Sequence, residues 1–248
     1  MLAGNIDAAL GGVNFPLLFT IEEKSPGEFK LFTLAADTED APTISFLVKK
    51  DSSYTTIADL KGKKIGNYPG STAQLIYRRT VSPYFKPDEA THVQMKAELE
   101  LAALESGQVD AIIVLEPLGT IAIEKGVATP IERALFSKYF FKDAPLATSI
   151  VSKKLIEKNP DAVRKLVEAT NEAVVFINTK PDETKKLLPK YTPLEASIAD
   201  NIRFPRIHTL FEIDRTKLQT LHDFLVTEKE LKEKKDVGTM ILNLSELR

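Results

Sequence analysis

The sequence predicts an α/β protein made of two similar lobes, with mixed, mostly parallel sheets. Two observations lead to this prediction: strand-like and helix-like segments alternate along residues 64–115, and a helix–glycine–strand pattern occurs twice. The chain has 248 residues, of which 43% are hydrophobic and 27% charged. This length and composition suit one large domain or two small lobes with a real core.

The repeated pattern relates residues 1–10 to residues 104–113. In each copy a glycine, Gly4 or Gly107, precedes a β-branched residue, then Asp-Ala and an apolar run. Glycine adopts the left-handed C′ conformation at low cost, so each glycine should end a helix and each run should form a buried strand. About 40 residues of strand and helix lead into the second copy, a normal βαβ length, but almost none lead into the first. We interpret the first lobe as truncated at its N-terminus; the alternative is a fold that simply opens at Met1.

The second copy and its lead-in predict most of the second lobe. Apolar runs predict strands, and helical periodicity predicts the segments between them. The expected strands are 65–68, 92–95 and 109–115, and the expected helices are 71–80 and 98–105. This alternation indicates βαβ units.

Strands are also expected at 31–36, 43–49 and 147–152, and the last two should pair and cross between the lobes. Asn159-Pro160-Asp161 predicts the start of a long helix, because Asn caps, Pro fits the first turn and Asp suits the helix dipole. Thr192-Pro193-Leu194-Glu195 has the form of a capping box. We therefore assign residues 1–46 and 152–248 to lobe 1 and residues 47–151 to lobe 2.

Composition argues against several classes of function. The net charge of −2 gives no bulk attraction to nucleic acid or to an anionic membrane. Without cysteine the chain has no disulfide, thiolate nucleophile or cysteine metal site, and its three histidines are scattered. We expect no metal and no cofactor. No apolar run is long enough to span a bilayer, and Met1–Gly4 has no signal-peptide pattern, so the chain is cytoplasmic or its export signal is missing.

Ligands of open α/β sheets bind at the carboxyl ends of strands, and a first predicted loop there is Gly11-Gly12-Val13-Asn14-Phe15-Pro16. Its candidate ligand-binding residues are Gly12, Asn14 and Phe15. The two glycines allow close approach of the backbone. Phe15 either forms an apolar wall for a ligand or belongs to the core.

A second loop, Tyr68-Pro69-Gly70-Ser71-Thr72-Ala73, joins a strand to a helix. The first N–H groups of a helix lack internal partners and carry partial positive charge, so this turn could hold an anion with help from the hydroxyls of Ser71 and Thr72. The alternative is that Ser71 is an ordinary N-cap. The candidate residues are Tyr68, Gly70, Ser71, Thr72 and Ala73.

The third loop begins at Glu116-Pro117. Glu116 either accepts hydrogen bonds from a ligand or serves as a helix-start carboxylate before Pro117 at N1. The sequence has no Gly-x-Ser-x-Gly or His-Glu-x-x-His motif, and no catalytic residue is predicted.

Several of these pieces occur together, and in the same order, in the type 2 periplasmic substrate-binding proteins of ABC importers. The chain resembles the branch of that family that binds nitrate, sulfonates, taurine and thiamine pyrimidines. Each piece is weak alone, but the ordered set is specific for the superfamily. The matching pieces are 1–10, Asp59-Leu60-Lys61-Gly62-Lys63-Lys64-Ile65, 70–73, 104–111, Glu116-Pro117 and 158–179.

The resemblance implies two α/β lobes joined by two crossing strands, which close around a ligand by a hinge motion. Residues 70–73 would contact the ligand from one lobe and residues 11–15 from the other. It also implies a small-molecule ligand, a membrane permease as partner, an extracytoplasmic location, a monomer and no direct membrane insertion. Members carry about one further βαβα segment and an export signal before the position of Gly4, which supports truncation.

The ligand remains open between two chemistries. A sulfonate or nitrate-like oxyanion suits the helix N-terminus, whereas a flat pyrimidine suits Phe15, Tyr68 and Glu116. Enzymes of pyrimidine or menaquinone biosynthesis share the architecture and form a second hypothesis, although the pyrimidine synthases use cysteines that this chain lacks. A ligand-sensing module of a larger regulator is a third.

Overall fold

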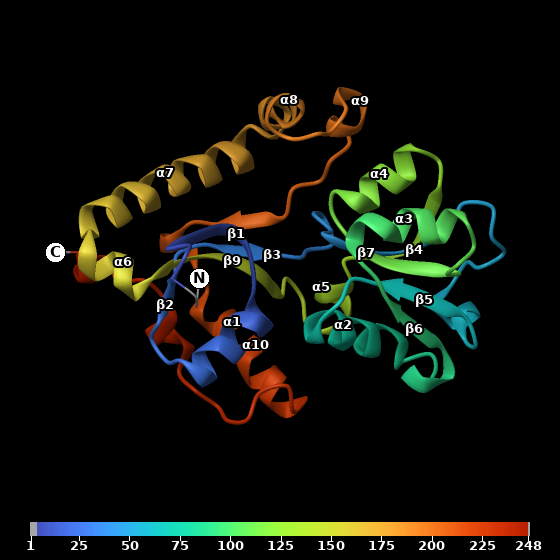
Figure 1. Cartoon of the computed structure of the whole chain (residues 1–248), viewed down its shortest axis with the longest axis horizontal. Coiled ribbons are helices and arrows are strands. Elements are labelled where there is room, and N and C mark those ends of the chain that lie inside the picture. Colours follow the sequence, from blue (N-terminus) through green and yellow to red (C-terminus); the bar gives the residue numbers. More distant parts are fainter. Residues whose placement is uncertain (1–3, 248) are drawn as a thin grey trace. The chain divides into compact units, whose positions relative to one another are not determined.

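The computed structural model describes residues 4–247, and the chain forms two compact units. Unit 1 comprises the residues up to Ala36, Ala144–Pro181 and the residues from Arg206 onward, and unit 2 comprises Asp37–Asp143 and Asp182–Pro205 (Figure 1). The chain therefore passes between the units four times. Two of the boundaries between the units fall at Ala36/Asp37 and Asp143/Ala144, whereas the sequence predicted lobe boundaries at 46/47 and 151/152. Residues 182–205 belong to unit 2, because helix α9 packs against helix α4 of that unit.

Unit 1 is built on one sheet, sheet A, with helices on both of its faces. Its strands are β1 (Ala8–Asn14), β2 (Phe29–Leu31), β3 (Leu34–Ala36), β9 (Pro145–Ser152) and β10 (Arg206–His208). Its helices are α1 (Phe15–Lys24), α6 (Lys153–Lys158), α7 (Pro160–Thr179) and α10 (Arg215–Thr227), with the 3-10 helices η3 (Leu210–Glu212), η4 (Val237–Met240) and η5 (Leu244–Leu247). Figure 1 shows α7 on one face of sheet A and α1 and α10 on the other.

Strand β9 is the centre of sheet A. It pairs with β1 on one side and with β2 and β3 on the other, and every one of these described pairs is antiparallel. β1 and β2 therefore run in the same direction and are joined by α1, with β9 inserted between them. The expectation of mostly parallel sheets is wrong for sheet A, because the inserted strand turns each neighbouring pair antiparallel.

Unit 2 is built on a second sheet, sheet B, which is mixed. Its strands are β4 (Ile44–Lys49), β5 (Lys64–Asn67), β6 (Thr91–Gln94), β7 (Ala111–Leu115) and β8 (Ala128–Arg133), in the order β6-β5-β7-β4-β8. Its helices are α2 (Ser71–Val81), α3 (Ala97–Glu105), α4 (Leu118–Glu124), α5 (Leu135–Tyr139), α8 (Pro181–Tyr191) and α9 (Ala196–Ala199), with the 3-10 helices η1 (Ile57–Leu60) and η2 (Pro87–Glu89). β5 is parallel to β6 and β7, whereas β4 is antiparallel to both β7 and β8.

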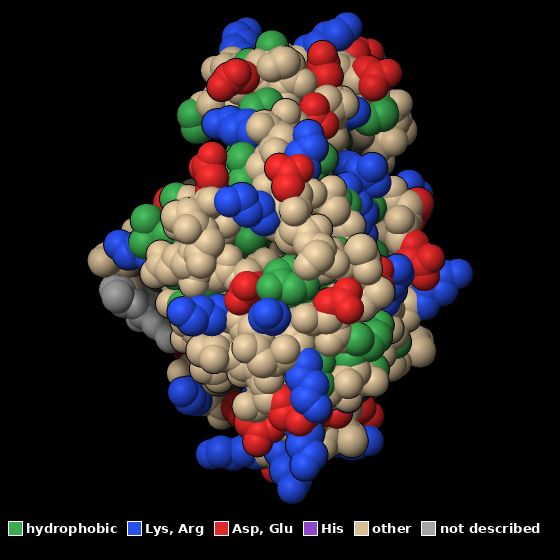
Figure 2. Space-filling model, turned by 90° about the vertical axis from the view of Figure 1, so that its right-hand side faces the viewer, with side chains coloured by type: hydrophobic (Ala, Val, Ile, Leu, Met, Phe, Trp, Pro, Cys, Tyr) green, Lys and Arg blue, Asp and Glu red, His purple; other side chains and the backbone are tan. Residues whose placement is uncertain are grey.

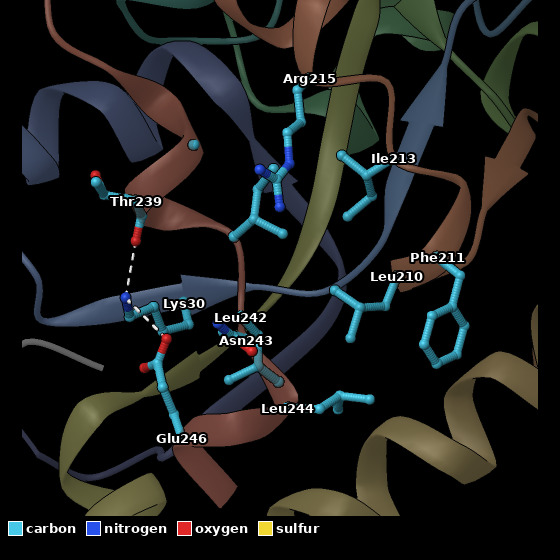
Figure 3. Close-up of a pocket in the computed structure, with 12 residues that line it drawn as sticks. Lys30, Leu210, Phe211, Ile213, Arg215, Thr239, Leu242, Asn243, Leu244 and Glu246 are labelled. Carbon is cyan, nitrogen blue, oxygen red and sulfur yellow. Dashed lines mark hydrogen bonds and ion pairs between the residues drawn. The ribbon is translucent and has the colours of Figure 1, made fainter.

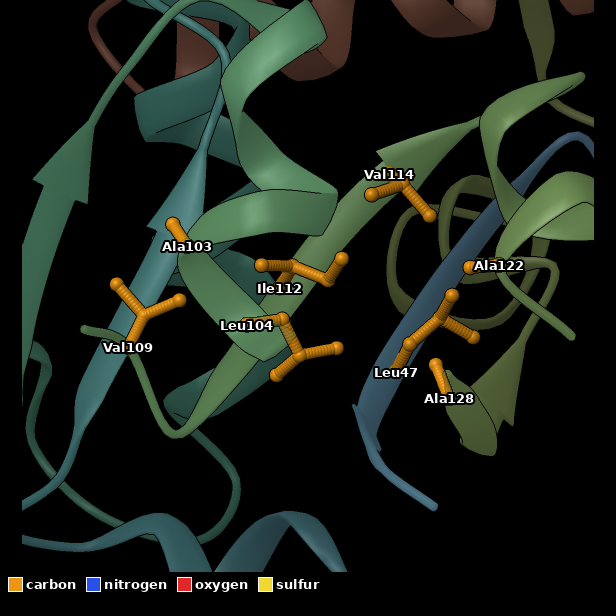
Figure 4. Packing of buried hydrophobic residues seen from close by; sticks show 8 residues of the cluster. All are labelled: Leu47, Ala103, Leu104, Val109, Ile112, Val114, Ala122 and Ala128. Carbon is orange, nitrogen blue, oxygen red and sulfur yellow. The ribbon is translucent and has the colours of Figure 1, made fainter. Parts of the chain in front are cut away.

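Helices α3 and α4 cover one face of sheet B, and α2 and α5 cover the other (Figure 1). Under α3 and α4 lies a cluster of buried apolar side chains from the strands and both helices (Figure 4). Its members are Leu47, Ala103, Leu104, Val109, Ile112, Val114, Ala122 and Ala128. Burial of this much apolar surface fixes the strand ends and helix starts that form the candidate site.

The α/β class and the two-sheet architecture are confirmed, but one predicted pairing is wrong. Residues 43–49 and 147–152 do not pair, because β4 lies in sheet B and β9 in sheet A. Each is instead the antiparallel strand inserted in the middle of its own sheet. Both are mostly apolar strands buried on two faces, and such a strand does not specify its partner.

Predictions that depend on neighbouring residues, such as helix caps, agree better with the structure than the predicted strand pairing does. Gly4 and Gly107 both have φ of 75°, as predicted, although the residues that would form the helix before Gly4 lie largely outside the described residues. α7 begins at Pro160, and the Asn159 side chain accepts a hydrogen bond from Ala162 N at 3.0 Å. The helix expected at Pro193 begins only at Ala196. Within residues 4–247, no helix has the length and apolar character that a membrane crossing needs.

Candidate functional site

The carboxyl ends of four strands, β5, β6, β7 and β8, lie along one edge of sheet B. β5 and β7 pair in parallel, with Asn67 opposite Ile113. β4 begins at the same edge, where Ile44 lies opposite Leu115, and β8 ends there, where Arg133 lies opposite Ser45. We call this edge, with the residues that immediately follow β5, β7 and β8 and precede β4, the carboxyl edge.

The turn at Pro69-Gly70 leads into α2 at this edge. Gly70 is the N-cap residue, with φ of 121°, and no side chain caps the helix among the described residues. The exposed Ser71 is the first helical residue, so the alternative that Ser71 is the N-cap is wrong. The buried side chain of Asn67 fixes the turn, because it donates to the Ala73 carbonyl at 2.9 Å and accepts from Tyr68 N at 2.8 Å. The N-cap residue of α2 therefore contributes no side-chain hydrogen bond to the helix start, and the neighbouring Ser71 is exposed.

Tyr68 directly follows β5 and lies within electrostatic range of a buried acid, Glu100. The side chain of Glu100, in the first turn of α3, is 1% exposed, and its Oε1 has no hydrogen-bond partner. Burial raises the pKa of Glu100 to about 8, and the charge of Glu98 adds to the rise. Burial also raises the pKa of the Tyr68 hydroxyl, which the charge of Glu100 raises further. This corner of the carboxyl edge thus holds a carboxyl group that is mostly protonated at neutral pH.

Glu116 follows β7, and its peptide bond to Pro117 is cis. Its Oε2 accepts a hydrogen bond from Thr120 N at 3.3 Å, so Glu116 does act as a helix-start carboxylate for α4. Its Oε1 is buried and has no partner. Pro117 is the N-cap residue of α4 rather than N1. Burial raises the pKa of Glu116, and the hydrogen bonds to Thr120 and the nearby arginine charges oppose that rise.

The start of β4 is held at the edge by a fully buried carboxylate, Asp37. Its Oδ1 accepts from Thr43 N at 2.6 Å, and its Oδ2 accepts from Phe136 N at 2.9 Å and Ser137 N at 3.2 Å. Burial raises the pKa of Asp37, and these hydrogen bonds lower it. Thr43, positioned in this way, has a buried Oγ1 without a partner.

Residues 11–16 of unit 1 do not form the predicted loop. β1 continues to Asn14 through a bulge, where Gly11 N donates to Ser149 Oγ at 3.0 Å, and α1 begins at once at Phe15. Gly12 is exposed in the strand. The Asn14 side chain caps α1 by accepting from Leu17 N at 2.9 Å. Phe15 is 0% exposed, 5.8 Å from the Phe19 ring, so it belongs to the core and offers no wall to a ligand.

A groove lies elsewhere, in unit 1, beside β2 (Figure 3). It measures about 690 Å³, and Phe211 and Leu244 are exposed along it. Lys30 closes one end by donating to the Thr239 carbonyl at 2.7 Å and pairing with Glu246 at 3.5 Å. This arrangement ties the C-terminal segment to β2.

On the face shown in Figure 2, basic and acidic side chains are interspersed, in keeping with the net charge of −2. Among residues 4–247, no three histidine, aspartate or glutamate side chains are grouped as a metal ion would require.

The family is shown by comparison with known proteins. A family model described as NMT1/THI5 like matches residues 27–184, more than half of the chain, and the chain belongs to this family. A protein of Brucella abortus named as a binding protein is 28% identical over 145 residues, covering 57% of this chain and 44% of that protein. An aliphatic sulfonates-binding protein of Bacillus subtilis is 26% identical over 224 residues, covering 87% of this chain and 64% of that protein. The chain thus spans less than two thirds of these relatives.

Solved structures show the same fold. The alkanesulfonate-binding protein SsuA of Xanthomonas axonopodis pv. citri, bound to MOPS, matches with a TM-score of 0.73 at 17% identity, over 97% of this chain and 81% of that chain. The desulfurization enzyme DSZB matches with a TM-score of 0.71 at 19% identity, over 97% of this chain and 83% of that chain. The fold therefore occurs in both binding proteins and an enzyme.

Four residues at or near the carboxyl edge were not predicted from the sequence: Thr43, Glu100, Arg133 and Arg203. Glu100 carried a usable signal, because it shares a helix face with the buried Ala103 and Leu104, where a charged residue is unusual. The other three carry none, since only the strand register and chain topology bring them to one edge.

Proposed function

We propose that this protein is the extracytoplasmic solute-binding component of an ABC importer and that it binds a small anion, a sulfonate or similar oxyanion, at the carboxyl edge of sheet B. One observation carries the proposal: α2 begins at this edge without a side-chain cap, beside buried polar atoms that lack partners. A helix start in this state favours an anion. The names of the Bacillus and Xanthomonas proteins, which specify sulfonates, support this ligand class.

Gly70, Ser71, Thr72 and Ala73 are proposed to contact the anion, with Tyr68 and Glu116 beside it. The proposed partner is a membrane permease, and the protein is proposed to act as a monomer.

A same-fold enzyme is the second candidate, and the DSZB structure shows why it is considered. The observation in its favour is Glu100, a buried acid whose pKa of about 8 suits proton transfer near neutral pH. We favour binding without chemistry, because the Bacillus and Xanthomonas proteins named above are described as binding proteins. Mass spectrometry of any ligand recovered after incubation separates the two: an unchanged ligand supports binding, and a new product supports an enzyme.

Thermal unfolding of the purified chain with methanesulfonate, nitrate, bicarbonate, amino acids and thiamine pyrimidines tests the proposal, because a ligand that binds only the folded state raises the midpoint. We expect the sulfonate to raise it. Ser71→Ala removes only a hydroxyl, whereas Ser71→Pro also removes an N–H while keeping a residue that helix position N1 accepts.

The sulfonate shift should shrink in Ser71→Ala and shrink further in Ser71→Pro. Shifts that match the wild type in both variants would move the site away from α2. Response to a pyrimidine alone would replace the anion by a heterocycle as ligand.

A further inference from the structure

Arginine side chains share one face of the carboxyl edge with the unpartnered polar atoms. Val114, Ser45 and Arg133 lie opposite one another across β7, β4 and β8, so their side chains point to the same face. Val114 packs in the cluster under α3 and α4, which identifies that face. Glu116 and Thr43 lie two residues from Val114 and Ser45, and the hydrogen bond from Glu116 N to the Thr43 carbonyl, 2.9 Å, extends the ladder.

Arg203 reaches the same place from the other end of the chain. It follows α9, which packs against α4, the helix that starts beside Glu116. Burial lowers the pKa of the Arg133 guanidinium, the charge of Arg203 lowers it further, and Glu116 raises it. Both arginines lower the pKa of Glu116. The three charged groups therefore lie within electrostatic range of one another.

None of these groups is fully satisfied within residues 4–247. Neither guanidinium has a hydrogen bond or ion pair there, and the buried Glu116 Oε1 and Thr43 Oγ1 have no partner. Arg203 is exposed and its donors can reach water, whereas the partly buried Arg133 has five N–H donors to place. Two like charges within electrostatic range of each other also repel. An oxyanion between the arginines would relieve the repulsion and accept from both, and the Thr43 hydroxyl is a further donor.

We propose that Arg133 and Arg203 form a two-guanidinium grip, with Thr43 as third donor, for the oxyanion head of a small organic acid, and that Glu116 restricts this head to a single negative charge. This inference rests on the proposed anion-binding function and names the residues that choose among anions.

The restriction follows from counting charges. Two arginines and an ionised Glu116 sum to a net charge of +1, which a monoanion such as a sulfonate neutralises. A dianion leaves one negative charge uncompensated beside the Glu116 carboxylate, whose Oε1 is buried, and the two like charges repel each other. This mismatch in charge disfavours the binding of sulfate and phosphonate dianions. Specificity between ligands commonly depends on repulsion of the wrong one.

Methanesulfonate and sulfate are the matched probes, because both present a tetrahedral oxyanion but differ in charge. Calorimetric titration of the whole chain should show that Arg133→Gln and Arg203→Gln each weaken methanesulfonate about tenfold or more, the loss expected for one charge-assisted hydrogen bond. Lys125→Gln, a control at the opposite end of α4 where the lysine is exposed, should bind as the wild type does. Glu116→Gln should raise the affinity for sulfate relative to methanesulfonate about tenfold.

Each of the following outcomes would contradict a specific part of the proposal. If the wild type binds methanesulfonate and both arginine variants bind it equally well, the grip is wrong while the proposed function stands. If the wild type binds neither probe, both proposals are wrong. If Glu116→Gln leaves the preference unchanged, the charge restriction is wrong. Should an arginine variant fail to fold, NMR of the wild-type arginine Nε–H signals decides: the Arg133 and Arg203 signals must move when methanesulfonate is added.

Discussion

The two units contain the same βαβ arrangement but finish it differently. In unit 1, β1 and β2 flank the inserted strand β9 and are joined through α1. In unit 2, β7 and β8 flank the inserted strand β4 and are joined through α4. The repeated Gly-x-β-branched-Asp-Ala sequence leads into the first strand of each arrangement.

At the end of that first strand the two units diverge. In unit 1, Asn14 caps α1 with its own side chain and Phe15 fills the core, so the described polar groups of this turn are satisfied internally. In unit 2, Glu116 leaves one oxygen without a partner and lies near Arg133 and Arg203. Buried polar groups without partners are costly, and they persist where a ligand supplies the missing bonds. The difference teaches that the repeat specifies the fold, whereas the departures from it indicate the site.

The largest effect is expected when the buried ring of Phe15 is removed from unit 1. Phe15→Ala should lower the free energy of unfolding by about 3–5 kcal/mol, because a fully buried aromatic ring is replaced by a cavity. Leu17→Ala, on the same helix but 49% exposed, should cost less than about 0.5 kcal/mol. Urea titration measures both. A small loss for Phe15→Ala would mean that Phe15 is not core, and its role as a ligand wall would return.

In unit 2 the next prediction concerns Glu100, a buried acid whose charged form is disfavoured by burial. Glu100 has a raised pKa of about 8 in the folded state, against 4.5 as its ordinary value. Between these values the folded state binds more protons than the unfolded state, so stability falls as pH rises through this window and is level above it.

Glu100→Gln should remove this decline and stabilise the protein at pH 8.5 by an amount on the order of 3 kcal/mol. Glu105→Gln, exposed at the end of α3, serves as the control and should follow the wild-type profile. Urea titrations at several pH values give the profiles. If the stability of Glu100→Gln and of the wild type depended on pH in the same way, the charged form of Glu100 would not be destabilised by burial.

The smallest effect on stability is expected at Asn14, the N-cap of α1. Asn14→Ala should cost about 1 kcal/mol of stability, because Leu17 N loses its acceptor, and Asn14→Ser should recover most of it. Thermal unfolding with and without methanesulfonate measures stability and binding together. Unchanged stability combined with loss of the sulfonate shift would make Asn14 a ligand-binding residue and remove the contrast between the two units.

The sequence predicted features that depend on neighbours along the chain. Gly107 ends α3, Asn159 caps α7 and the turn at Gly70 precedes α2, since capping and glycine conformation are local properties. It did not predict features set by register. The bulge that carries β1 through Gly11, the separate sheets of β4 and β9, and the meeting of Arg133 with Arg203 all depend on which strands lie side by side, and apolar runs leave that choice open.

The central place of β9 in sheet A has a consequence for biosynthesis. All five strands of sheet B lie between Ile44 and Arg133, so they leave the ribosome before β9 does. Until β9 emerges, the strands β1, β2 and β3 lack the common partner that joins them, and their edges stay open. Strands β1, β2 and β3 are thus made before sheet B but gain their common partner after it, so their edges stay exposed on the nascent chain for longer.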